Sequence, residues 1–89
     1  MRALTDVEFD ILNVSYFIEP FEKIVEEVTA PENIVADSLK FLIEHKLVTA
    51  MKWDEKHSVY KRSYIYDSDN MYAYSYQVTK DGLIAHNTR

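Results

Sequence analysis

The chain has 89 residues, of which 47% are hydrophobic and 28% charged, with a formal net charge of −5. This length suits one small domain over residues 1–89 and excludes a dinucleotide-binding fold or a barrel enzyme. No apolar run approaches the ~20 residues that cross a bilayer, and the absence of cysteine excludes disulfides and thiolate chemistry, so we expect a cytoplasmic protein without a membrane partner.

The first predicted element is a helix over residues 5–17. Thr5 and Glu8 have the spacing of a capping box, in which each side chain accepts a hydrogen bond from the backbone amide of the other residue. The apolar residues that follow at helical spacing are Phe9, Leu12 and Tyr16.

Two prolines indicate the starts of the next two helices. The first turn of a helix does not need the amide that proline lacks, so Pro20 predicts a helix over 20–28 and Pro31 a helix over 31–45. The short segment between them predicts a tight turn. The apolar stripe of the second of these helices is Val35, Leu39 and Leu42.

After residue 46 the hydrophobic pattern changes to that of strands. Residues 47–53 are rich in apolar and β-branched side chains, which predicts a strand, and the polar segment 54–58 predicts a loop. Tyrosines then alternate at strand spacing on both sides of the turn-like segment 67–70. We therefore predict strands and one long hairpin within residues 47–79.

The register of this hairpin follows from the tyrosine pattern. A three-residue loop at 68–70 would place five tyrosines on one face as cross-strand pairs, each contributing roughly 0.2–1 kcal/mol. The facing pairs would be Tyr66 with Tyr72, Tyr64 with Tyr74, and Arg62 with Tyr76. A short helix over 80–86, capped by Thr79, completes the chain.

This order of elements predicts an α+β fold of a particular kind. Three N-terminal helices, the last two joined by a tight turn, precede a long antiparallel hairpin and a short C-terminal helix. Such an arrangement is a helix-turn-helix followed by a β-hairpin wing, which is the winged helix-turn-helix.

Two segments carry a family resemblance. The spacing Val35-x3-Leu39-x2-Leu42-x4-Leu47-Val48 resembles the third helix and first wing strand of MarR-like and PadR-like transcriptional regulators. The segment 76–82, Tyr-Gln-Val-Thr-Lys-Asp-Gly, is similar to the Tyr-x-Leu-Thr-x-x-Gly segment that ends their second wing strand. These families usually have glycine where this chain has Lys46, so Lys46 must adopt a left-handed conformation or the helix must end differently.

The resemblance implies a DNA-binding transcriptional regulator whose partner is double-stranded DNA. The helix over 31–45 would be the recognition helix in the major groove, and the wing would contact phosphates. The predicted contact residues are Asn33, Asp37 and Lys40 on the helix and Lys56, Lys61 and Arg62 in the wing. Charge opposes this reading, because residues 1–46 hold ten acidic and four basic side chains.

The alternative is a protein-protein interaction or dimerisation module that does not bind DNA. Tyrosine and tryptophan are enriched at protein interfaces. The candidate interaction surface is Trp53, Tyr64, Tyr66, Tyr72 and Tyr74, and the partner would be a second copy or another protein.

Enzymatic activity is not predicted. The chain has no glycine-rich phosphate loop and no Ser-His-Asp pattern. None of its three histidines has a second metal ligand three or four residues away in a metal-binding pattern. We therefore expect no catalytic residue, no metal site and no cofactor.

Overall fold

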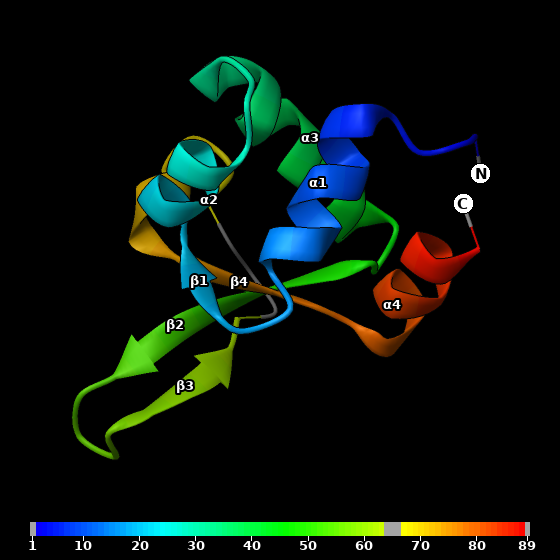
Figure 1. Cartoon of the computed structure of the whole chain (residues 1–89). Helices are drawn as coiled ribbons and strands as arrows, with labels where there is room; N and C mark the ends of the chain where they lie inside the picture. The colour runs from blue at the N-terminus through cyan, green and yellow to red at the C-terminus, as the bar shows by residue number, and fades with distance from the viewer. Residues whose placement is uncertain (1, 64–66, 89) are drawn as a thin grey trace.

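The computed structural model describes residues 2–63 and 67–88, which form an α+β fold with four α-helices and a four-stranded antiparallel sheet (Figure 1). None of the described helices is both long and apolar enough to span a bilayer. In chain order the elements are α1 (Asp6–Val14), β1 (Glu19–Pro20), α2 (Phe21–Glu27), α3 (Glu32–Glu44), β2 (Val48–Asp54), β3 (Val59–Arg62), the 3-10 helix η1 (Met71–Ala73), β4 (Ser75–Val78) and α4 (Lys80–Asn87).

The capping box at the start of α1 is confirmed. The Glu8 amide donates to Thr5 Oγ1 at 3.1 Å, and the Thr5 amide donates to Glu8 Oε1 at 2.9 Å. The helix ends at Val14, three residues earlier than predicted. The Ser15 carbonyl accepts instead from the Val78 amide at 2.9 Å, which joins the end of α1 to β4.

Both prolines precede their helices rather than opening them. Pro20 and Pro31 are the N-cap residues of α2 and α3 and have extended ψ angles of 160° and 147°. Pro20 also belongs to β1, a strand that the sequence pattern does not predict. β1 lies at the edge of the sheet, where a missing amide is tolerated.

The sheet has the strand order β1-β4-β2-β3, so β2 lies between β3 and β4 and the predicted pairing of Arg62 with Tyr76 is wrong. Arg62 pairs with Met51 and Tyr76 with Ala50, because the turn over residues 55–58, one residue shorter than the predicted loop, folds β3 back on one edge of β2 and leaves the other edge to β4. Tyr72 lies in η1 rather than in a strand. Tyr64 and Tyr66 lie outside the described residues.

The core forms where α1, α2 and α3 cover one face of the sheet. Tyr76 is fully buried there, and its hydroxyl donates to the Met71 carbonyl at 2.8 Å. A buried phenol needs such a partner. The remaining core residues are Ile11, Leu12, Phe21, Ile24, Val28, Val35, Leu39, Leu42, Leu47, Val48, Ala50, Met71 and Val78.

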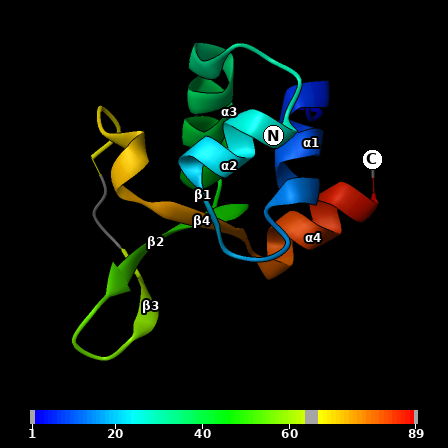
Figure 2. The same cartoon turned by 60° about the vertical axis from the view of Figure 1, so that its left-hand side comes forward.

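The C-terminal helix is placed by two contacts. Thr79 caps α4 as predicted, accepting from the Gly82 amide at 3.0 Å. The His86 ring stacks on Phe9 of α1 with ring centres 4.2 Å apart. α4 therefore packs against α1 at one end of the sheet, away from the β2–β3 hairpin (Figures 1 and 2).

Lys46 at the end of α3 has a φ angle of 59°. Of the two alternatives expected for this residue, the left-handed conformation is therefore confirmed. Its amide donates to the Ile43 carbonyl at 3.0 Å, and the Leu47 amide donates to the Leu42 carbonyl at 2.8 Å. These two bonds make a Schellman motif with lysine at the left-handed position.

Replacing Lys46 with glycine is expected to stabilise the fold by roughly 1 kcal/mol, because glycine adopts this conformation without the steric cost that a Cβ imposes. Urea unfolding followed by circular dichroism measures the change. The matched control is Lys40→Gly inside α3, which we expect to destabilise by about 1 kcal/mol. An unchanged or lowered midpoint for Lys46→Gly would show that the left-handed lysine carries no strain.

Candidate nucleic-acid interface

The exposed face of α3 carries the residues predicted to approach bases. Asn33 and Asp37 are exposed, and Lys40 is partly buried. Asp37 lies 3.9 Å from Lys40 Nζ, so the helix holds this lysine near its own carboxylate. In all, α3 has three acidic residues (Glu32, Asp37 and Glu44) and one basic residue (Lys40). Its field alone therefore repels phosphate.

Tyr72 of η1 contacts the first turn of α3, whose residues Glu32, Asn33 and Ile34 stay exposed. The Tyr72 hydroxyl donates to Glu32, and the Tyr72 ring packs edge-on against Phe21 with centroids 4.7 Å apart. Tyr74 is partly buried against the core, and its hydroxyl accepts from the Asp67 amide at 2.8 Å. Tyr72 thus connects η1 to α2 and α3, whereas the Tyr74 hydroxyl joins two ends of the segment before β4.

The β2–β3 hairpin is organised around Asp54. Its carboxylate accepts from Lys61 Nζ at 2.8 Å, from His57 Nδ1 at 2.7 Å and from the Lys56 amide at 3.0 Å. The hydrogen bond from Lys61 and then that from His57 lower the pKa of Asp54 to about 2. Ser58 closes the loop with a left-handed φ of 51°.

This hairpin is the basic part of an acidic chain. Residues 52–62 hold four basic and two acidic side chains, whereas the rest of the chain holds six basic and thirteen acidic ones. Lys61 lies against Asp54, but Lys56 Nζ forms no ion pair with any residue the structure describes. Figures 1 and 2 both show the hairpin projecting beyond the helices.

An open groove of about 570 Å³ extends the basic surface from the hairpin toward α4. Arg62, at the end of β3, lines it together with Lys46 and Lys80, and Asp81 is its one carboxylate among the described lining residues. The groove brings together cations that lie far apart in the sequence. Of the wing residues predicted to contact phosphate, it includes Arg62 only.

The residues of the predicted aromatic surface that the structure describes do not form one cluster. Trp53 pairs across the hairpin with Tyr60, with ring centroids 4.9 Å apart, whereas Tyr72 lies against Phe21 near α2. Tyr60 is the residue that the sequence analysis missed. A signal was present, because Trp53 and Tyr60 flank the polar 54–58 loop at nearly equal distances.

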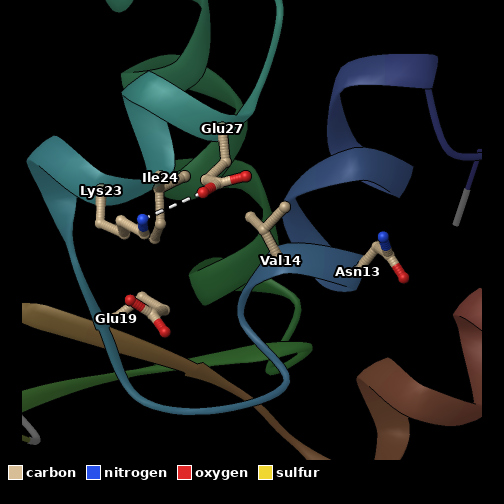
Figure 3. A pocket seen from close by; sticks show the side chains of 6 residues that line it. All are labelled: Asn13, Val14, Glu19, Lys23, Ile24 and Glu27. Carbon is tan, nitrogen blue, oxygen red and sulfur yellow. Dashed lines mark ion pairs between the residues drawn. The ribbon is translucent and has the colours of Figure 1, made fainter.

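A smaller hollow of about 260 Å³ lies between α1, β1 and α2 (Figure 3). Lys23 Nζ is 3.1 Å from Glu27 Oε1, and this contact raises the pKa of Lys23. Glu19 lies at the other side of the hollow (Figure 3). The hollow has an acidic balance and is poorly suited to phosphate.

Comparisons of this chain with protein-family models, with curated proteins and with solved structures each found no match.

Proposed function

We propose that this chain is a DNA-binding domain of the winged-helix type that regulates transcription. The observation that carries the proposal is the placement of charge. A basic hairpin follows a pair of helices, α2 and α3, that are separated by only four residues. In helix-turn-helix proteins the second helix of such a pair enters the major groove, and hairpin cations can neutralise phosphates.

In this proposal α3 supplies the base contacts. Asn33 has the side-chain type that bonds adenine, and Lys40 has the type that bonds guanine or phosphate. Asp37 positions Lys40 and can accept a hydrogen bond from cytosine. The hairpin cations Lys56, Lys61 and Arg62 supply the phosphate contacts that offset the acidic charge of α3.

Binding of a labelled random duplex, followed by fluorescence anisotropy at several salt concentrations, tests the proposal. We expect the logarithm of the affinity to fall linearly with the logarithm of salt concentration, by about 0.9 for each phosphate contacted. Lys56→Gln should weaken binding at every sequence and reduce the slope by about 1. Lys23→Gln is the matched control, because Lys23 lies on α2 beside an acidic hollow and should leave binding unchanged.

No binding at low salt, where charges are least screened, would contradict the proposal. Equal weakening by Lys56→Gln and Lys23→Gln would also contradict it, because the effect would then follow net charge rather than the hairpin.

The second candidate function is a protein-interaction module, favoured by the acidic exposed face of α3. Asp37 is 73% exposed on that face, and the nearby cation Lys40 lies against it. Such a face suits a basic partner surface. Retention of the chain on a basic protein partner, abolished by Asp37→Lys and unaffected by Lys56→Gln, would support this candidate.

A further inference from the structure

The outer face of the β2–β3 hairpin forms a small aromatic and cationic patch. Side chains of a strand alternate between the two faces of a sheet. Ala50 and Tyr76 face the core, so Met51 and Trp53 of β2 lie on the opposite face, as do their directly paired partners Arg62 and Tyr60. The patch is defined as these four residues: Met51, Trp53, Tyr60 and Arg62.

The aromatic rings of the patch are open to solvent. Trp53 is 48% exposed and Tyr60 is 39% exposed, and their rings meet edge to face with an interplanar angle of 68°. The edge of one ring meets the other, so the rings do not cover each other's faces as a stacked pair would. A flat aromatic ligand can therefore lie on an indole face that would otherwise contact water.

Charge around the patch favours an anionic ligand. Arg62 shares the face with the rings, Lys56 lies in the loop at the end of the hairpin, and the hairpin is basic while the remainder of the chain is acidic. Successive side chains on one face of a strand are about 6.8 Å apart. A base against Trp53 would thus leave its phosphate within reach of Arg62.

We infer that this patch binds an unpaired segment of a nucleic-acid strand, with bases stacked on Trp53 and Tyr60 and phosphates held by the hairpin cations. Aromatic side chains beside a positively charged surface are the usual means of binding single strands without sequence preference. The rings of the patch are separate from the face of α3 that would contact duplex bases, whereas the hairpin cations would contact phosphates of either a duplex or an unpaired strand.

Protein occupants fit the patch less well. A stable protein interface buries about 800 Å² on each partner and uses roughly 20–30 residues a side, far more than this patch offers. Pairing of β3 with β3 of a second copy would also bring Lys61 and Arg62 close to the same residues of that copy. Like charges placed opposite each other oppose such pairing.

The chain contains one tryptophan, so the intrinsic fluorescence of Trp53 reports directly on the patch. We expect a ten-nucleotide oligothymidylate to quench this fluorescence at low salt, and an abasic oligonucleotide of the same length and charge not to quench it. Equal quenching by the two strands would overturn the inference, because it would show binding through phosphates alone.

Point variants test whether the oligothymidylate binds at the patch. In anisotropy measurements with the labelled oligothymidylate, Trp53→Ala and Tyr60→Ala should each weaken binding by about tenfold, within the range for loss of one stacked base. Trp53→Phe should recover most of the affinity. Tyr16→Ala is the matched control, because Tyr16 is 58% exposed and pairs edge-on with Phe17 at a site outside the hairpin. Circular dichroism melts of the exposed-site variants establish that each is folded.

Failure of this inference can be separated from failure of the proposed function. Duplex binding without oligothymidylate binding would overturn the inference alone, and binding of neither would contradict both. A concentration-dependent dimer in light scattering, lost in Trp53→Ala, would instead assign the patch to self-association and overturn the inference.

Discussion

Replacing Gly82 with alanine is expected to destabilise the protein by about 2–3 kcal/mol, although alanine is by itself the better helix former. A Cβ at this position would lie 2.1 Å from the Leu47 carbonyl oxygen and 2.6 Å from Val78 Cγ2. The nearer atom belongs to the backbone, which is fixed because the same carbonyl accepts from the Thr79 amide at 3.0 Å. α4 would therefore have to move away from Leu47 and from β4.

Thermal unfolding of the Gly82→Ala variant measures this effect. A loss of this size corresponds to a midpoint lower by roughly 10–20 °C in a domain of this length. Lys80→Ala, at an exposed site in the first turn of the same helix, should change the midpoint little. A Gly82→Ala protein as stable as the wild type would show that α4 adapts without cost.

Removal of the Glu8 side chain is the second large expected effect. Glu8 is 1% exposed, and its carboxylate accepts from Arg2 at 2.6 and 2.8 Å as well as from the Thr5 amide. Glu8→Ala removes the capping box and leaves the Thr5 amide without its partner. We expect a loss of about 2–3 kcal/mol in urea unfolding at pH 7. The control is Glu22→Ala, an exposed carboxylate in the first turn of α2.

The same carboxylate gives stability a pH dependence. Burial acts to raise the pKa of Glu8, but the hydrogen bonds from Arg2 and Thr5 and the charge of Arg2 outweigh it, so the pKa lies below its ordinary value of 4.5. A carboxyl group with a lowered pKa in the folded state stabilises the fold above its unfolded pKa, and this stabilisation is lost as the pH falls through the folded pKa.

The wild type should therefore lose stability below about pH 4.5, and Glu8→Gln should lose less over the same interval. Asp54, with a pKa of about 2, also loses its stabilising effect as the pH falls from about 3.8 to about 2. Urea midpoints at pH 7 and pH 3 measure the difference between the two proteins. An equal fall in both would contradict the role assigned to Glu8.

The sequence predicts the features that depend on interactions between residues close together in the chain. The caps at Thr5 and Thr79 follow from side chains that reach amides three residues away, and both form. The left-handed Lys46 is one of the two alternatives that the family resemblance implied for this position. The predicted helix boundaries are less accurate. The Ser15 carbonyl accepts a hydrogen bond from β4, and the two prolines have extended backbone, so these residues lie outside the helices.

The long-range pairing of this chain does not follow from its local sequence pattern. Tyr72, Tyr74 and Tyr76 share one alternating pattern, yet Tyr72 lies in η1 and Tyr76 lies in the core. The Met71 carbonyl that satisfies the Tyr76 hydroxyl is brought there by the tertiary fold. β1 has two residues, one of them proline, and no local pattern indicates a strand so short.

The roles of the candidate site residues stay predictions, and the structure shows only where these residues lie. The named cations of α3 and the hairpin are all at least partly exposed, as a binding surface requires. Two features depend on how β3 folds back onto β2. They are the ion pair of Lys61 with Asp54 and the groove that joins Arg62 to Lys46 and Lys80. The predicted strand pairing did not anticipate either of them. The nearly equal spacing of Trp53 and Tyr60 around the predicted 54–58 loop was the available clue to the β2–β3 pairing.

The position of β4 between β1 and β2 has a consequence for synthesis of the chain. A ribosome releases α1, α2, α3 and the β2–β3 hairpin before residues 75–78 emerge, so one edge of β2 and the buried site of Tyr76 stay open until late. Pairings this distant in sequence are slow to form. The nascent chain therefore exposes an apolar strand edge to chaperones and to neighbouring chains until residues 75–78 have left the exit tunnel.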